Sequence, residues 1–161
     1  MLDKDEFRSA LGQFATGVTV ITTLDDEGQP HSMTANAFSS ICLDPPTVMV
    51  CVAHGRHTNG YLEKTNRFGV NILKQEQLEL GVYFAKKPAD RTGEVNYNYS
   101  AAADKTPVLD DSMVFFGCEV KGAHVYGDHT IYVGEVTEMR RNDSSSPLMF
   151  FNSRWYNPTD Q

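Results

Sequence analysis

The chain is poor in cysteine, in long apolar runs and in positive charge. Its three cysteines are widely spaced and form no Cys-x-x-Cys pair, which argues against a disulfide framework or a zinc knuckle. Apolar runs reach only about seven residues, too short to cross a bilayer. A formal net charge of −7 disfavours nucleic acid, since phosphate-backbone binding relies on clustered Lys and Arg. Because the N-terminus, MLDKDEF, is also unlike a signal peptide, we expect a soluble cytoplasmic protein with no membrane or nucleic-acid partner.

Several motifs that mark common enzyme classes are also absent. The sequence contains no Gly-x-Gly-x-x-Gly dinucleotide fingerprint, no Gly-x-x-x-x-Gly-Lys-Ser/Thr phosphate loop and no Gly-x-Ser-x-Gly elbow. The pairs His54/His57 and His124/His129 have no acidic or thiol ligand at a characteristic metal spacing. We therefore expect no metal site, and the difficult chemistry of any enzyme here would belong to an organic cofactor.

Strand-like stretches separated by turn signals dominate what is present. We expect strands over 18–23, from residue 31 after a turn at 25–30, and over 47–53, 67–73, 112–121, 129–139 and 147–151. Helices are expected over 3–15, after a cap at Thr58 or Asn59, and from about 75 to 85. The polar segment 86–106 has no periodicity, which is typical of functional covers or of disordered loops. The pattern predicts a mainly β, closed or half-closed antiparallel barrel with a few peripheral helices, in one domain spanning 1–161.

The two longer helices each carry an apolar stripe. In 3–15, Phe7, Leu11 and Phe14 recur at i, i+4 and i+7, an acidic residue can cap the start and Gly17 follows the end. Such a helix is expected to cover an open barrel end. In the later helix, the residues expected to face inward are Leu78, Val82 and either Phe84 or Ala85.

The stretch from His31 to Ala53, HSMTANAFSSICLDPPTVMVCVA, has an unusual order of residue types. Small hydroxyl and amide side chains come first, then Pro45-Pro46 and a short apolar run. Neither proline can donate to a sheet ladder, so the pair marks a break between strands. The stretch suits a floor on which a flat, polar-edged ring could lie. The alternative is a Ser/Thr-rich edge strand in an ordinary barrel.

Six segments, taken in order, resemble one known family. They are FATGVTVITT (14–23), MTANAFSSICLDPPTVMVCV (33–52), RHTNGYLEKTNRFGVNIL (56–73), VYFA (82–85), GDHTIYVGEV (127–136) and PLMFFNSRWY (147–156). The family is that of the short-chain flavin reductases, NAD(P)H:flavin oxidoreductases with an FMN-binding split β-barrel of Greek-key type. The resemblance covers nearly the whole chain and implies the same fold here.

The resemblance also implies roles for individual positions. The segment 34–40 would hold the isoalloxazine ring and ribityl chain, the segment 51–53 would line the ring's other edge with backbone groups, and 56–58 would meet the flavin phosphate. A guanidinium and a hydroxyl near a helix start suit an anion. Ser153 replaces a glycine usual in the family near its C-terminal aromatic contact. The implied flavin-binding residues are Thr34, Ala35, Asn36, Ala37, Ser39, Ser40, Cys51, Val52, Ala53, Arg56, His57, Thr58, Phe84, Ala85, Asp128 and Tyr156.

His129 is the implied catalytic residue. In the family, the Gly-Asp-His motif, here 127–129, is associated with the nicotinamide site. Hydride transfer needs stacked rings more than a strong acid or base, so proximity and orientation supply most of the effect. The imidazole could fix the carboxamide or stabilise anionic reduced flavin. Without the resemblance, a structural hydrogen-bonding role for this histidine would be the simpler reading.

The resemblance implies an NAD(P)H-dependent flavin reductase. It would transfer hydride to FMN or FAD and supply reduced flavin, by diffusion, to a separate monooxygenase. NADH is expected rather than NADPH, because the binding loop has no Arg/Lys cluster for a 2′-phosphate. A homodimer is implied. The phenylalanine-rich strand 113–118 and the aromatic C-terminus suit such an interface and are equally compatible with an intramolecular core. The alternatives are a non-catalytic flavin- or haem-binding carrier or sensor, and an oxidase related to the pyridoxamine phosphate oxidases.

Overall fold

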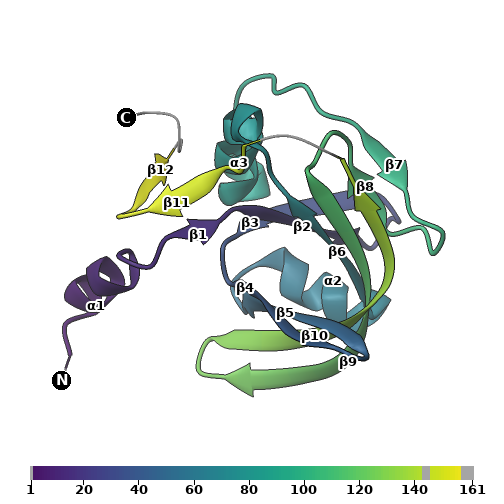
Figure 1. Cartoon of the computed structure of the whole chain (residues 1–161), viewed down its shortest axis with the longest axis horizontal. Helices are drawn as coiled ribbons and strands as arrows, with labels where there is room; N and C mark the ends of the chain where they lie inside the picture. The colour runs from purple at the N-terminus through teal and green to yellow at the C-terminus, as the bar shows by residue number, and fades with distance from the viewer. Residues whose placement is uncertain (1, 143–145, 157–161) are drawn as a thin grey trace.

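The computed structural model describes residues 2–142 and 146–156, arranged as in Figure 1. Its strands are β1 (Thr16–Gly17), β2 (Thr19–Leu24), β3 (Pro30–Ala35), β4 (Phe38–Leu43), β5 (Pro46–Ala53), β6 (Arg67–Ile72), β7 (Tyr99–Ala101), β8 (Pro107–Leu109), β9 (Val114–Tyr126), β10 (His129–Arg141), β11 (Met149–Phe151) and β12 (Arg154–Tyr156). Its helices are α1 (Lys4–Leu11), α2 (His57–Thr65) and α3 (Leu78–Ala85), with 3-10 turns η1 (Gln75–Gln77) and η2 (Pro88–Asp90).

Seven strands form one antiparallel sheet in the order β3-β2-β6-β9-β10-β5-β4. The long strands β9 and β10 connect the half of the sheet that contains β2, β3 and β6 to the half that contains β5 and β4 (Figure 1). Within the described residues, the end strands β3 and β4 do not pair with each other, so the barrel is split between them. Helix α2 contacts β2, β3, β5 and β6, and therefore spans the open side. The predicted mainly β barrel is confirmed.

Local turn chemistry sets the strand breaks near the split. The β2–β3 hairpin pairs from Thr19 with Ala35 to Leu24 with Pro30, as the sequence predicts. Its turn is held by the Asp25 carboxylate, which accepts hydrogen bonds from the backbone N–H groups of two later turn residues. Strand β4 ends just before the Pro45-Pro46 pair and β5 begins within it, so the prolines do separate two strands.

Two apolar clusters fill the two faces of the barrel wall. The inner cluster comprises Ile21, Met33, Val48, Val50, Val52, Leu62, Phe68, Val70, Cys118 and Tyr132. The outer cluster, beneath α3 and β11, comprises Val18, Val20, Leu73, Leu80, Phe84, Leu109 and Leu148. Neighbouring residues of β2 belong to different clusters because successive side chains of a strand point to opposite faces. Each fully buried Val, Leu, Ile or Phe stabilises the fold by about 1.5–3 kcal/mol.

Helix α1 differs from its prediction. The Asp3 side chain does cap it, accepting from the N–H groups of Asp5 and Glu6, but the helix ends at Leu11, well before Gly17. None of its residues is buried, and Phe7 and Leu11 are more than half exposed. Figure 1 shows α1 standing apart from the barrel, beyond β1. The expectation that it covers a barrel end is therefore wrong for this single chain.

The other helices correct two local predictions. Helix α2 begins at His57, so Thr58 lies inside it and cannot be its cap; the Thr58 hydroxyl instead bonds His31. In α3 the inward residues include Phe84, as predicted, whereas Leu78 is 41% exposed because η1 takes up the start of the expected helix. Among the described helices, none combines the length and apolar character needed to cross a membrane.

The segment 86–106 is more ordered than its composition predicts. It contains η2 and β7, and β7 pairs with β8 in a small separate sheet. Tyr97 packs against Tyr83, Phe84 and Tyr99, with ring centroids 5.0–5.9 Å apart. These contacts hold the segment against α3. We name the segment 86–106 the wall after α3, because it lies beside the C-terminal end of that helix.

Candidate functional site

Two hollows adjoin along strand β3. The first, which we name the basic hollow, has a volume of about 190 Å³ and is lined by His31, Met33, Gly55, Arg56, His57, Thr58, Lys86, Lys87, Pro88, Ala89 and Arg91. The second, which we name the apolar hollow, also measures about 190 Å³ and is lined by Val18, Thr34, Ala35, Asn36, Ala85, Phe150 and Trp155. Both the β3 strand and the C-terminal end of α3 pass directly from one hollow into the other.

The charge of the basic hollow is its main chemical feature. Four of the chain's 14 Lys and Arg residues line it, although the chain as a whole is acidic. Among the described residues that line it, none is Asp or Glu. Two histidines, His31 and His57, also line it. Concentrated positive charge without a compensating carboxylate favours an anionic group, and Arg and Lys side chains bind phosphate through charge-assisted hydrogen bonds.

Arg91 connects this hollow to the barrel. Its Nη2 donates to the Ser32 backbone carbonyl at 2.7 Å, and its guanidinium carbon lies 5.1 Å from the centroid of the Phe84 ring and 5.6 Å from that of Tyr83. Burial lowers the pKa of Arg91 from its ordinary value of 12.5, but an arginine remains charged at neutral pH. Arg91 therefore fixes the wall that follows α3 and adds positive charge.

His31 forms the floor of the same hollow. Its Nε2 lies 2.8 Å from the Thr58 hydroxyl oxygen, and its ring meets the Tyr61 ring edge-on at 4.9 Å between centroids. Burial lowers the pKa of His31 to about 4, and the nearby positive charges of Arg91 and His57 act in the same direction. At neutral pH the imidazole is therefore uncharged in the ligand-free protein.

Small and aromatic residues shape the apolar hollow. The Thr34 hydroxyl donates to the Gly81 carbonyl at 2.7 Å, which ties β3 to α3. A Cβ atom at Gly81 would approach Trp155 to 3.2 Å, so glycine allows α3 and β12 to pack closely. Trp155 meets Phe150 at 5.4 Å with the rings tilted by 71°. The result is an open, largely apolar recess beside the polar end of β3.

His129 and Asp128 lie at the tip of the β9–β10 hairpin. A two-residue turn connects the paired residues Tyr126 and His129, and Gly127 supplies the positive φ of 60° that this turn needs. His129 Nδ1 lies 2.7 Å from Asp128 Oδ1. The backbone N–H of His54 donates to the Asp128 carbonyl at 2.9 Å, and this contact joins the tip to the end of β5.

The structure brings together only part of the predicted set. Arg56, His57 and Thr58 line the basic hollow, and Thr34, Ala35, Asn36 and Ala85 line the apolar hollow. The Cys51 backbone N–H donates to the Ala37 carbonyl, and Ala53 pairs with His129, so these residues connect the β3–β4 turn to the hairpin. The residues that line neither hollow are Ala37, Ser39, Ser40, Cys51, Val52, Ala53, Phe84, Asp128, His129 and Tyr156.

The structure places the side chains of three of these residues away from both hollows. Val52 and Phe84 are 0% and 1% exposed and belong to the two apolar clusters, so neither side chain reaches a surface ligand directly. Ser39 lies on edge strand β4, where its hydroxyl donates to the Ser40 carbonyl. A role for the backbone of these residues stays a prediction.

Sequence reasoning missed several lining residues. Those of the basic hollow are His31, Met33, Gly55, Lys86, Lys87, Pro88, Ala89 and Arg91, and those of the apolar hollow are Val18, Phe150 and Trp155. The Lys86-Lys87-Pro88 sequence directly after a predicted helix was the available signal. Its pairing with Arg56 depends on the fold, because the two stretches are distant in the sequence.

Comparison with known proteins decides the family. The family model described as "Flavin reductase like domain" matches residues 11–159. The chain belongs to this family. An NADH-dependent flavin reductase, StyB, from Pseudomonas fluorescens is 37% identical over 157 residues, which cover 96% of this chain and 90% of that protein.

Further relatives agree with this assignment. The reductase component of a 4-nitrophenol 4-monooxygenase/4-nitrocatechol 2-monooxygenase from Rhodococcus opacus is 34% identical over 96% of this chain and 80% of its own. The solved structure of the flavin reductase PheA2 superposes with a TM-score of 0.90 at 34% identity, and the match covers 99% of this chain and 100% of that one. The predicted family and split-barrel fold are confirmed.

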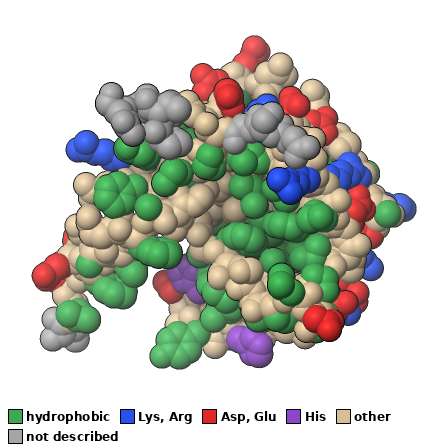
Figure 2. Space-filling model, in the orientation of Figure 1, with side chains coloured by type: hydrophobic (Ala, Val, Ile, Leu, Met, Phe, Trp, Pro, Cys, Tyr) green, Lys and Arg blue, Asp and Glu red, His purple; other side chains and the backbone are tan. Residues whose placement is uncertain are grey.

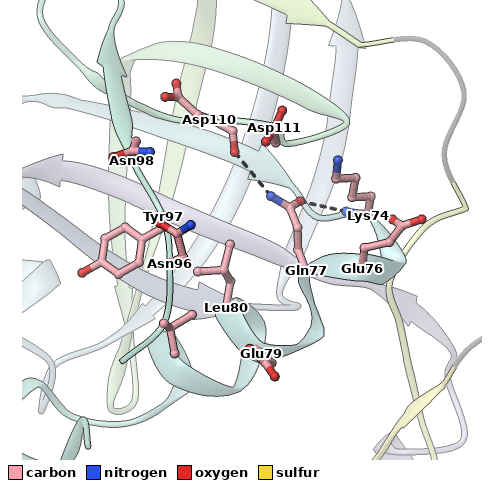
Figure 3. Close-up of a pocket in the computed structure, with 11 residues that line it drawn as sticks. Lys74, Glu76, Gln77, Glu79, Leu80, Asn96, Tyr97, Asn98, Asp110 and Asp111 are labelled. Carbon is pink, nitrogen blue, oxygen red and sulfur yellow. Dashed lines mark hydrogen bonds between the residues drawn. The ribbon is translucent and has the colours of Figure 1, made fainter. Parts of the chain in front are cut away.

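A third hollow, larger than these two, lies elsewhere and has the opposite character. Figure 3 shows it between η1, the start of α3 and the stretch before β7. It measures about 300 Å³ and is lined by four carboxylates, from Glu76, Glu79, Asp110 and Asp111, with Lys74 as the one basic residue among the described lining residues. This charge disfavours a phosphate. It shares no described lining residue with the basic or the apolar hollow.

Proposed function

We propose that this chain is an NAD(P)H-dependent flavin reductase that takes hydride from NADH and supplies reduced FMN or FAD to a separate monooxygenase. One observation carries the proposal: a basic hollow adjoins an apolar hollow along β3. A flavin nucleotide has two matching parts, an anionic phosphate arm and a flat ring. Family membership supplies the reaction class, and a relative that is a monooxygenase reductase component supports the separate partner.

In this proposal the basic hollow binds the flavin phosphate. Arg56, Lys86 and Lys87 donate charge-assisted hydrogen bonds, and Thr58 offers a hydroxyl. The ring and ribityl chain lie along 34–40, where small side chains leave the backbone accessible, and against the backbone of 51–53. Met33, Ala35 and Ala85 limit the space between the two parts of the ligand.

When bound, a flavin would supply the hydride acceptor and NADH would supply the hydride. The protein's task is to hold the two rings in contact, because orientation supplies most of the rate. His129 is proposed to act from the hairpin tip, where it fixes the carboxamide or stabilises negative charge developing on the ring. Asp128 orients the imidazole through the 2.7 Å hydrogen bond.

The fold changes the argument for preferring NADH over NADPH. The sequence showed no Arg/Lys cluster in the binding loop, but the structure gathers Arg56, Lys86, Lys87 and Arg91 around one hollow. The premise holds for the loop's own sequence, but it no longer argues against a 2′-phosphate at this hollow. The preference for NADH remains a proposal, because the cluster is assigned here to the flavin phosphate. The relatives include the NADH-dependent StyB and, at the same 37% identity, a flavin reductase (NADPH) from Lentzea aerocolonigenes.

We also propose that two copies of the chain form a dimer. Helix α1 exposes Phe7 and Leu11, and Phe14 is exposed just after it. The hairpin tip exposes Val125 and Tyr126 to 71% and 84%. Figure 2 shows hydrophobic side chains at both places, on either side of a notch in the surface. Strand 113–118, expected at the interface, is instead largely internal, since Phe115 is 1% exposed.

A Phe14→Ser/Tyr126→Ser double variant would test this surface, with sedimentation velocity as the measurement. We expect the wild type to sediment as a dimer and the variant as a monomer. A wild-type monomer at micromolar concentration would contradict the dimer.

The reductase activity has a direct test. Purified protein is mixed with NADH and FMN, FAD or riboflavin, and NADH absorbance is followed against a reaction without flavin. We expect consumption that depends on both protein and flavin. Tight flavin binding without NADH consumption would instead indicate a carrier, and neither binding nor consumption would reject the proposed function altogether.

A further inference from the structure

We propose that His31 takes up a proton when a phosphate group enters the basic hollow, so that binding of a flavin nucleotide is coupled to protonation of this histidine. The inference rests on the proposed function for the identity of the ligand. It concerns a residue outside the predicted site, at a position where the structure juxtaposes a neutral imidazole, a hydroxyl and four permanent cations.

The surroundings of His31 are well defined. From α2 and its N-cap come Arg56, His57 and Tyr61, and Thr58 contributes the hydroxyl at 2.8 Å. From the wall after α3 come Lys86, Lys87 and Arg91, and from the β2–β3 turn comes Asp25. Of these groups, Asp25 alone favours a charged imidazole, whereas Arg91 and His57 oppose it.

These surroundings explain why the ligand-free imidazole is neutral. Burial removes water from the ring, and the neighbouring positive charges repel a further proton, so the pKa of His31 falls to about 4. An anion in the hollow reverses the repulsion by the cations, because it neutralises their charge and attracts an imidazolium. The pKa of His31 must therefore be higher in the complex than in the free protein.

The proton step is balanced and uses groups in contact. A proton from the solvent binds the unprotonated ring nitrogen, and the imidazole becomes a cation with two N–H donors. In the tautomer whose neutral Nε2 accepts from the Thr58 hydroxyl, the new Nε2–H donates to the Thr58 oxygen instead, and the Thr58 hydroxyl hydrogen becomes free to donate to the phosphate. Protonation adds a positive charge in either tautomer and, in this one, also frees a donor.

The coupling has a definite pH dependence. Where free His31 is neutral and bound His31 is protonated, the dissociation constant falls about tenfold for each unit by which the pH is lowered. The gain is complete below the free pKa of about 4 and is lost as the pH rises through the higher pKa of the complex. FAD is the suitable ligand because its diphosphate gains no proton between pH 5 and 8, whereas the FMN phosphate titrates near about pH 6.

Isothermal titration calorimetry in buffers of different ionisation enthalpy measures the protons taken up. Near pH 6 we expect up to about one proton per FAD bound by the wild type and none with riboflavin, which has no phosphate. His31→Gln should lose the uptake, while the matched variant His124→Gln, at a residue that lines neither hollow, should retain it. Uptake that is absent in the wild type, or unchanged in His31→Gln, would overturn the inference.

NMR provides a readout that does not depend on the variant's folding. The His31 imidazole signal of the wild type, one of five histidines, is titrated with and without FAD. We expect its titration to move to higher pH in the complex, and an unmoved titration would overturn the coupling. NADH consumption that persists without proton uptake would reject this inference alone, whereas a protein that neither binds FAD nor consumes NADH would reject the proposed function.

Discussion

His129 and Asp128 are hydrogen-bonded to each other across 2.7 Å at a hairpin tip that their own turn creates. The hydrogen bond from His129, followed by the imidazole's charge, lowers the pKa of Asp128. Asp128 is almost fully exposed and His129 is about half exposed, so the pair adds little to stability. The hydrogen bond instead fixes the orientation of the imidazole at the start of β10.

This relationship predicts the outcome of His129→Ala. We expect flavin reduction to slow by roughly 10- to 100-fold, because a misplaced ring pair loses much of the orientation effect, while flavin affinity stays nearly unchanged. Stopped-flow measurement of flavin reduction, with affinity from flavin fluorescence, separates the two quantities. Asp128→Asn, which keeps a hydrogen-bond acceptor, should show a smaller loss. A large loss of affinity with normal hydride transfer would contradict this division of roles.

The basic hollow predicts a selective effect on phosphorylated flavins. Removing both adjacent lysines, in Lys86→Ala/Lys87→Ala, should weaken FMN binding by roughly tenfold or more, since hydrogen bonds to charged groups contribute about 1.5–3 kcal/mol each before screening by solvent. Riboflavin affinity should not change. The matched control Lys4→Ala/Lys121→Ala removes the same charge from residues that line neither hollow. Equal losses for FMN and riboflavin would show that the lysines do not contact the phosphate.

The sequence predicted elements more reliably than it predicted contacts between them. The β2–β3 hairpin and the break at Pro45-Pro46 follow from local chemistry and were foreseen. The basic hollow could not be foreseen in full, because its two lysines and Arg56 meet only when the wall after α3 closes against α2. The predicted position of helix α1 was wrong for a related reason. An apolar stripe shows that the helix needs a packing partner, but it does not show which surface provides that partner.

The cysteines offer a graded labelling prediction. Cys118 is fully buried, and burial raises its pKa to about 12, so iodoacetamide should not modify it in the folded protein at pH 8. Cys42 is exposed and should react fastest. Cys51 is half-buried and burial raises its pKa, so it should react slowly.

Because Cys51 is proposed to lie beside the ring, saturating FAD should slow its labelling further without affecting Cys42. Mass spectrometry of tryptic peptides distinguishes the three sites, and equal protection of Cys42 would point to a global change.

Two glycines in different surroundings should respond to alanine in opposite directions. A Cβ atom at Gly134, in β10, would lie 2.5 Å from a ring atom of Phe68 and 2.9 Å from the Cys118 Cβ, both in the tightly packed inner cluster. Gly134→Ala should therefore destabilise the protein by about 1–3 kcal/mol. A Cβ atom at Gly60, within α2, meets nothing within 4 Å, so Gly60→Ala should stabilise it by roughly 0.5–1 kcal/mol through helix propensity. Urea unfolding followed by circular dichroism measures both changes. A neutral Gly134→Ala would mean that β10 can move away from Phe68, and that the packing which fixes the hairpin bearing His129 is looser than these distances indicate.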